Sequence, residues 1–479
     1  MSMASWLRTR RNGRALAASA VLLAAGGLVL LRADAHLHPE SPPGDTRPIV
    51  APDRHDLGFS GPGVHGSLSL SHSSVLPGSQ ELFADIRLVA DSSSQASERA
   101  PLAMTVVLDT SGSMQGEKIE RAKESCLELL RDMRDNDEIS FVRYSDTAEL
   151  IQRLARVGSV RSWLAGRIRS LQADGGTNIP RGLAAGLETL RAASRDRVER
   201  LVLVSDGLDG SRAEAERMAS GSFEHGVSIS SLGIGLDFDE SYMGGVARAG
   251  HGNFAFVQDA STLASFLRRE LEETAHTTVE NTTVHLKLPA GVRLVRATGA
   301  DARGEDSSVD LKIGSMYAGE ERRVLVELAT NLRDGETRDV EGDVAWLRVG
   351  GGSGEARIPR VVVMGSNDRT RVENGRDGAV LARAASVAAS ERQLQAAQAY
   401  VRGDTAGAQN LIRLNLSNLR GAASAAPKDM AQLLHQQEQS YEATQRVFTS
   451  SPPTSTTGKA QAKAATVSNM NNAVTVHTY

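Results

Sequence analysis

Five oxygen-bearing side chains in three short segments are the residues of this sequence best suited to chemistry. They are two carboxylates and three hydroxyls, namely Asp109, Ser111, Ser113, Thr177 and Asp206. Oxygen donors without a histidine or a thiol suit a hard cation, and few carboxylates with open positions favour octahedral Mg²⁺ over a charge-rich Ca²⁺ cage. The pattern therefore predicts a magnesium site, with Mn²⁺ and Ca²⁺ as the other candidate ions.

A predicted α/β domain over residues 101–274 would bring the three segments together. Here short β-branched runs alternate with segments of helical periodicity, which is typical of a doubly wound, mostly parallel sheet with helices on both faces. The first segment, at 109–113, follows a predicted strand, the GGTN sequence at 175–178 precedes a helix, and the SDG sequence at 205–207 follows a strand. In open α/β folds ligands bind outside the carboxyl ends of the strands. We therefore expect all three segments at one edge of the sheet.

These segments resemble the metal-ion-dependent adhesion site of von Willebrand factor type A (VWA) domains, in their DxSxS loop, their GGT threonine and their SDG aspartate. The resemblance covers residues 101–274 of the 479. It implies that Ser111, Ser113 and Thr177 ligate the ion directly, whereas Asp109 and Asp206 act mainly through water. It also implies one open coordination position, which an Asp or Glu carboxylate of a protein partner would fill.

Members of this family are binding modules, so the resemblance implies cation-dependent protein binding and not catalysis. An N-cap would explain one of the five residues, not all of them. An enzyme is not expected, because Gly233 and Gly235 lack the third spaced glycine of a dinucleotide fingerprint and no nucleophilic serine elbow accompanies His251. The alternative is a structural or envelope-assembly factor in which the metal only stabilises the loops.

The N-terminus predicts export from the cytoplasm. Four arginines precede an uncharged stretch at residues 15–31, and Ala33-Asp34-Ala35 follows it. Two outcomes fit this pattern, a signal peptide over residues 1–35 or a retained anchor that spans the membrane through residues 15–31. Both place the remainder in the periplasm, at the outer face of the inner membrane, or outside the cell. A net charge of −4 without a dominant basic stripe argues against nucleic acid as a partner.

The other segments predict the surroundings of the α/β domain. Apolar residues alternate at a spacing of two in 65–98 and again in 279–366. Two strands alone are only marginally stable, so we expect both stretches to form one β-sandwich into which the α/β domain is inserted. The remaining predicted segments are a Pro-rich linker at 36–64, a helical region at 379–448 with breaks at Gly403 and Gly421, and a disordered tail at 449–479.

Overall fold

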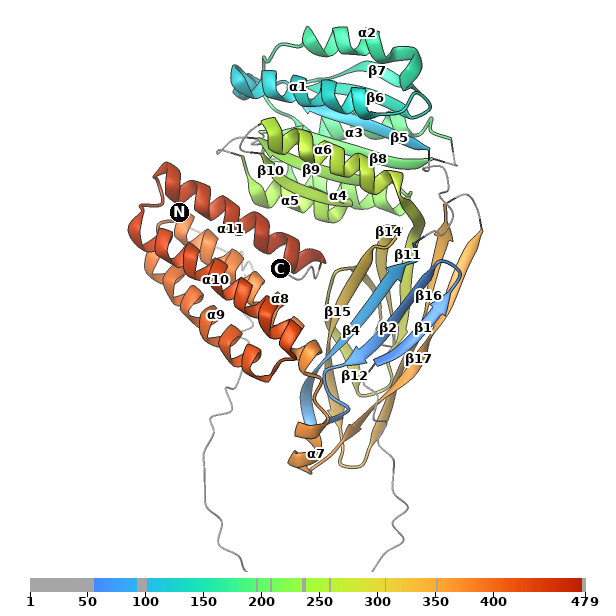
Figure 1. The fold of residues 1–479 in the computed structure, drawn as a ribbon, viewed down its shortest axis with the longest axis vertical. Helices are drawn as coiled ribbons and strands as arrows, with labels where there is room; N and C mark the ends of the chain where they lie inside the picture. Colours follow the sequence, from blue (N-terminus) through green and yellow to red (C-terminus); the bar gives the residue numbers. More distant parts are fainter. Residues whose placement is uncertain are drawn as a thin grey trace, which may run out of the picture. The chain divides into compact units, whose positions relative to one another are not determined.

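The structure is a computed structural model that describes residues 56–92, 101–194, 197–206, 209–234, 238–257, 260–305, 307–349 and 352–475. The predicted signal or anchor at residues 1–35 lies outside the described residues. The segment from residue 51 to 479 forms one unit. An α/β domain, a β-sandwich and a set of C-terminal helices can be distinguished within this unit (Figure 1).

The α/β domain contains a six-stranded sheet in the order β10-β9-β8-β5-β6-β7, and only β7 runs antiparallel to its neighbour. Every residue of the central strand β5 is buried, because helices cover both faces of the sheet. Helices α1, α2 and α6 pack on one face, whereas α3, α4 and α5 pack on the other. This arrangement confirms the doubly wound fold. The elements are β5 (Leu102–Asp109), α1 (Glu117–Asp132), β6 (Glu138–Tyr144), β7 (Ala148–Arg156), α2 (Val157–Arg169), α3 (Ile179–Leu190), β8 (Val198–Ser205), α4 (Arg212–Glu224), β9 (Ser228–Ile234), α5 (Glu240–Ala249), β10 (His251–Val257) and α6 (Ala260–Ala275).

Two further sheets form the β-sandwich, in the orders β1-β2-β4-β15-β12 and β13-β14-β11-β16-β17-β3. Their inner faces share one apolar core. The strands before the α/β domain are β1 (Asp56–Gly61), β2 (Val64–Leu70), β3 (Ser74–Val75) and β4 (Gly78–Ala90). Those after it are β11 (Thr277–Lys287), β12 (Val292–Thr298), β13 (Asp301–Glu305), β14 (Ser308–Tyr317), β15 (Glu321–Leu332), β16 (Thr337–Arg348) and β17 (Ser353–Gly365).

The α/β domain is an insertion in this sandwich, as predicted. Strand β4 precedes the domain and pairs antiparallel with β15, which follows it, from Gly78 opposite Leu332 to Val89 opposite Glu321. The prediction of a linker at 36–64 is wrong for its last residues, because β1 (Asp56–Gly61) forms an edge strand there and pairs with β2. Residues 36–55 lie outside the described part of the chain.

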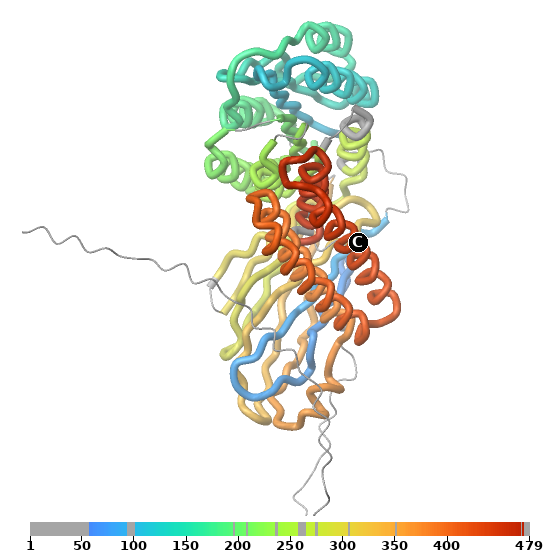
Figure 2. The backbone as a smooth tube through the Cα atoms, turned by 90° about the vertical axis from the view of Figure 1, so that its left-hand side faces the viewer, coloured from blue at the N-terminus to red at the C-terminus, as the bar shows by residue number. Residues whose placement is uncertain are grey.

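The C-terminal helices are α7 (Arg369–Asn374), α8 (Gly378–Val401), α9 (Thr405–Ala425), α10 (Lys428–Ser450) and α11 (Thr456–Thr475), and the tube view in Figure 2 shows α8 to α11 running alongside one another. Gly403 separates α8 from α9 with a φ of 89°, as expected for a glycine break. The predicted break at Gly421 is wrong, since this residue lies inside α9 and the helix ends before Pro427. None of the helices that the structure describes has both the length and the apolar character needed to cross a membrane.

The prediction of disorder for residues 449–479 is also wrong, because α11 occupies most of that segment. Its small residues Ala462 and Ala465 are buried. Hydrogen bonds from buried amides also hold α11 in place. Asn472 Nδ2 donates to Ser390 Oγ at 2.7 Å, and Asn469 Oδ1 accepts from the Tyr441 hydroxyl at 2.5 Å. The prediction took polar composition as a sign of disorder. A polar segment can nevertheless be buried here, because each of these amides has a hydrogen-bond partner on a neighbouring helix.

Helix α11 is also held against the α/β domain by one buried ammonium group. Lys463 Nζ donates to the Phe238 carbonyl oxygen at 2.8 Å, forms an ion pair with Glu240, and lies 4.3 Å from the centre of the Phe238 ring. The Phe238 carbonyl precedes α5, so this contact joins two segments that are far apart in the sequence.

We predict that Lys463→Met releases α11 from the α/β domain. The substitution keeps the side-chain length but removes the donor for the buried carbonyl oxygen, which costs about 1–3 kcal/mol. Hydrogen exchange should therefore become faster in α11 and in the first turn of α5. Lys459→Met, at an exposed position of the same helix, is the control. Equal exchange in the two variants would contradict the role given to Lys463.

Candidate metal centre

The carboxylate of Asp109 lies at the carboxyl end of β5 and is fully buried. Its Oδ1 accepts from the Ser111 backbone N–H at 2.8 Å, and its Oδ2 accepts from Ser205 Oγ at 2.6 Å and from the Tyr144 hydroxyl at 3.4 Å. Burial raises the pKa of Asp109, and the hydrogen bonds from Ser205 and Ser111 act against that rise. The ends of β5, β6 and β8 are therefore joined at one carboxylate.

Backbone hydrogen bonds place the loop before α3 beside the loop after β5. Gly112 N–H donates to the Gly175 carbonyl at 2.8 Å, and Asp174 N–H donates to the Thr110 carbonyl at 2.7 Å. Gly175 has a φ of 83°, in the region that favours glycine, and a Cβ there would come within 2.7 Å of an Asp146 oxygen. The glycine thus permits the close approach of the two loops.

Thr177 follows this turn directly and is half-buried. Its hydroxyl has no hydrogen-bond partner among the residues that the structure describes. The backbone contacts bring Thr177 to the same edge as Asp109, without a hydrogen bond to the other four predicted residues.

Asp206 completes the arrangement from the end of β8. Ser113 Oγ donates to Asp206 Oδ1 at 2.7 Å, and the hydroxyls of Ser113 and Ser111 lie 3.0 Å apart. Asp206 is buried except for a small fraction of its surface. Four of the five predicted residues therefore belong to one hydrogen-bonded group.

Sequence reasoning missed Lys118, in the first turn of α1. Its Nζ donates to Asp206 Oδ2 at 2.5 Å, and its side chain is 30% exposed. The available signal was a lysine five residues after Ser113, at the beginning of the helix that follows the DxSxS loop. The ammonium group supplies a positive charge to Asp206 from within the chain.

The donor set fits Mg²⁺ by its chemistry. It offers hydroxyl and carboxylate oxygens only, and two carboxylates match the charge of a divalent ion. Within the described part of the chain, no three His, Cys, Asp or Glu side chains gather into a group that could hold a metal. A cation at this edge would therefore depend on the hydroxyls of Ser111, Ser113 and Thr177.

Other residues that attract attention in the sequence lie elsewhere. Cys126 is buried in α1, and desolvation raises its pKa to about 12, as expected for a structural thiol. His251 begins β10, at the opposite end of the parallel strands from Asp109, and its ring stacks on Phe223 at 3.7 Å. Neither residue contributes to the candidate metal centre.

This fold and loop arrangement are those of a VWA domain, and the comparison with protein families agrees. Residues 104–269 match the family model described as the von Willebrand factor type A domain. This part of the chain is a VWA domain, whereas the sandwich and the C-terminal helices lie outside the match.

Curated relatives and solved structures extend the similarity. The chain is 24% identical to an uncharacterized protein of Synechocystis sp. over 261 residues, which is 54% of this chain and 62% of that protein. It is 28% identical to the uncharacterized protein YfbK of Escherichia coli over 251 residues, covering 49% and 43% of the two chains. Mouse inter-alpha-trypsin inhibitor heavy chain H2 is 31% identical over 157 residues, covering 30% and 16%. The chain thus spans less than two thirds of each of these relatives.

Two solved structures share the fold beyond the VWA domain. The von Willebrand factor type A protein from Catenulispora acidiphila has a TM-score of 0.64 at 18% identity, over 87% of this chain and 97% of that one. The ArnB paralog VWA2 from Sulfolobus acidocaldarius has a TM-score of 0.60 at 15% identity, over 86% and 100%. At these identities the likeness concerns the fold alone.

We predict that Lys118→Met strengthens Mg²⁺ binding, by roughly tenfold. The wild-type ammonium competes with the ion for the negative charge of Asp206. At an effective dielectric constant near 20, the Coulomb energy between two neighbouring unit charges is a few kcal/mol, and movement of the lysine side chain away from the ion reduces this value. Titration calorimetry with Mg²⁺ measures the change. Arg121→Gln removes a positive charge from the same helix, where it pairs with Glu117, and should leave the affinity nearly unchanged. Weaker Mg²⁺ binding in Lys118→Met would contradict this competition.

We also predict that Thr177→Val weakens Mg²⁺ binding without a change in the stability of the metal-free fold. Valine keeps the shape of threonine, and the lost hydroxyl has no hydrogen bond to a described residue, so the free energy of unfolding should change by less than about 0.5 kcal/mol. Chemical denaturation in EDTA and Mg²⁺ titration test the two parts. Thr177→Ser keeps the hydroxyl and should retain binding, and a valine variant that binds Mg²⁺ like the wild type would exclude Thr177 as a ligand.

Proposed function

We propose that this chain is a divalent-cation-dependent protein-binding module that works outside the cytoplasm. The observation that carries the proposal is the hydrogen-bonded group of Asp109, Ser111, Ser113 and Asp206, with Thr177 brought to the same edge. In this proposal Ser111, Ser113 and Thr177 hold Mg²⁺ directly, and Asp109 and Asp206 position its water. The bound ion would supply a positive charge with one open position for a carboxylate.

The partner in this proposal presents an Asp or Glu side chain to that open position. The position of the insertion supports access for a large ligand. At the amino ends of the parallel strands the domain meets the sandwich, where Arg303 of β13 pairs with Glu224 of α4 and Gly314 lies close to the Phe223 ring. The metal-binding loops lie at the carboxyl ends, which leaves them directed away from the sandwich.

Catalysis is not part of the proposal. The groups that contact the predicted ligands are hydroxyls, carboxylates and the Lys118 ammonium, and the described residues place no histidine or thiol among them. The basic and then uncharged N-terminal sequence supports export, by cleavage after a signal peptide or by retention as an anchor through residues 15–31.

A panel of immobilised peptides tests the proposed recognition of a carboxylate. Each peptide carries one Asp or Glu, and its matched control carries Asn or Gln at the same position. We expect binding of the exported portion to a subset of the acidic peptides in Mg²⁺, loss of this binding in EDTA, and loss with the amide peptides. An ion that completes its coordination with a carboxylate accounts for all three results.

The variants of Thr177 provide the control. Thr177→Val should lose Mg²⁺-dependent peptide binding, whereas Thr177→Ser should retain most of it. Binding that is equal in Mg²⁺ and EDTA would reject the adhesion mechanism. If Mg²⁺ instead raises only the melting temperature and no acidic peptide binds, the ion stabilises the loops and the contacts of a structural or assembly factor lie elsewhere.

A further inference from the structure

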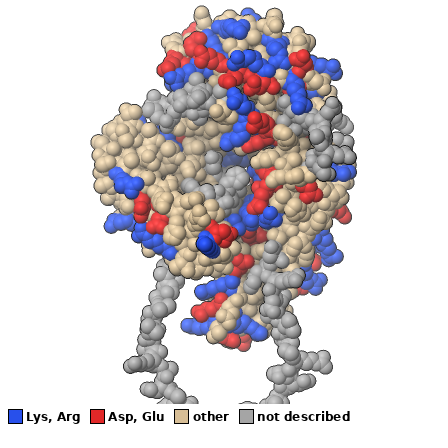
Figure 3. Space-filling model, viewed as in Figure 1, with Lys and Arg blue, Asp and Glu red and all other residues tan. Residues whose placement is uncertain are grey.

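A cavity of about 640 Å³ lies where the VWA domain, the sandwich and the C-terminal helices meet. The VWA domain contributes residues of β9, α5, β10 and α6, the sandwich contributes residues of β12, β14 and β15, and helices α8 and α11 close it from a third side. Figure 3 shows a hollow on this face with basic and acidic side chains along it. This volume suits a small ligand.

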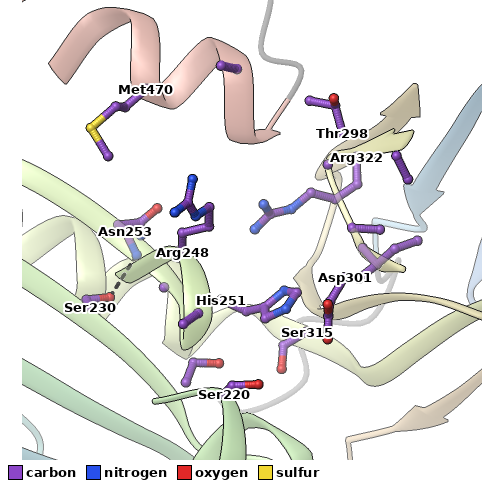
Figure 4. Close-up of a pocket in the computed structure, with 18 of the residues that line it drawn as sticks. Ser220, Ser230, Arg248, His251, Asn253, Thr298, Asp301, Ser315, Arg322 and Met470 are labelled. Carbon is purple, nitrogen blue, oxygen red and sulfur yellow. Dashed lines mark hydrogen bonds between the residues drawn. The ribbon is translucent and has the colours of Figure 1, made fainter. Parts of the chain in front are cut away.

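Two guanidinium groups enter the cavity from different parts of the chain. Arg248 comes from the last turn of α5, and Arg322 comes from β15 of the sandwich. In the close-up of Figure 4 both side chains extend into the space beneath Met470 of α11. The VWA domain and the sandwich thus each contribute one arginine.

Arg248 has no ion pair or hydrogen bond with any residue that the structure describes, and its side chain is exposed to the cavity. Arg322 has one carboxylate beside it, because its Nε forms an ion pair with the buried Glu320. Glu320 Oε2 also accepts from the Tyr317 backbone N–H at 2.9 Å. Arg322 is therefore held by Glu320, whereas Arg248 has no carboxylate partner among the described residues.

The other charged groups of the lining are matched within the chain. Arg296 pairs with Glu327 and Glu391, Arg212 pairs with Glu216, and Asp301 pairs with Arg303. Asn253 Nδ2 donates to Glu270 at 2.6 Å and to Glu273 at 2.7 Å, and burial raises the pKa of Glu270. Arg200 lies close enough to Glu270 to influence its titration. Among the charged residues of the lining, Arg248 is thus the one for which the described part of the chain provides no partner.

Neutral hydrogen-bonding groups lie around the two arginines. His251, Ser220 and Ser315 border the same space in Figure 4. Desolvation lowers the pKa of His251 to about 4, so its ring is neutral near pH 7, and a hydrogen bond to the Ile313 backbone already uses one ring nitrogen. These groups could complete the coordination of a polar ligand without adding charge.

We propose that this cavity binds a small anion whose oxyanion group, a phosphate or a carboxylate, is held between Arg248 and Arg322. A planar guanidinium offers parallel N–H donors that match the oxygens of either group, and such charge-assisted hydrogen bonds are about twice as strong as neutral ones. The anion would contact the VWA domain through Arg248 and the sandwich through Arg322. Its binding would therefore stabilise the arrangement of these two parts.

Titration calorimetry of the full chain with inorganic phosphate, and separately with succinate, tests this site. The measurements are made in EDTA, so the metal centre does not contribute. We expect saturable binding of at least one of the two anions, and the stronger ligand identifies which oxyanion the cavity takes. Arg248→Gln should weaken that binding about tenfold or more, since it removes one charge-assisted pair.

Arg169→Gln is the matched control, because Arg169 is also an exposed arginine in the last turn of a helix without a partner among the described residues. This variant should bind like the wild type. Arg322→Lys keeps a positive charge beside Glu320 but loses the forked donors, and it should also weaken binding. Asp206→Ala should retain anion binding, which separates this site from the proposed metal centre. Absence of binding of both anions, or equal affinity of Arg248→Gln and wild type, would overturn the proposal.

Discussion

The buried carboxylate of Asp109 is the constraint on which the candidate metal centre depends. A charged group without exposure must find donors within the protein, and Asp109 finds them on its own loop, on β6 and on β8. This requirement fixes the spacing of three strand ends. Once they are fixed, Ser113 and Asp206 come within hydrogen-bond distance, and the backbone contacts of Gly112 and Asp174 bring the Thr177 loop to the same place.

The insertion supports this edge from the opposite end of the domain. The chain leaves the sandwich after β4 and returns at β11, and the turn between β14 and β15 contacts both junctions: Gly319 N–H donates to the Ala90 carbonyl at 2.9 Å, and Ala318 N–H donates to the His276 carbonyl at 2.8 Å. Both connections are therefore close together, at the amino ends of the strands. Because the sandwich constrains only that end, loops at the carboxyl ends are available for ligands.

The sequence predicted features that have a regular period or a fixed spacing. Strand and helix periods identified the doubly wound domain and the sandwich, and the DxSxS spacing identified residues that the structure brings together. It did not predict features that depend on tertiary contacts. Residues 456–475 looked too polar to fold, because partners for Asn469 and Asn472 lie on helices distant in sequence. Lys118 and Arg248 were missed because a single cation in a helix usually faces solvent, and only the fold shows which groups surround it.

Helix α11 contacts the VWA domain at two places, and its packing therefore bears on both of them. Lys463 Nζ donates to the carbonyl oxygen of Phe238, in the loop that follows β9 at the carboxyl ends of the strands. Thr466 and Met470, further along the same helix, line the cavity near the amino ends of the strands. Two sites influence each other only when their ligands favour different positions of a shared element. Helix α11 contacts the loop after β9 through Lys463 and lines the cavity through Met470, so it is the element that both regions share. Its buried amides, which need specific partners, would oppose small displacements and favour one defined position.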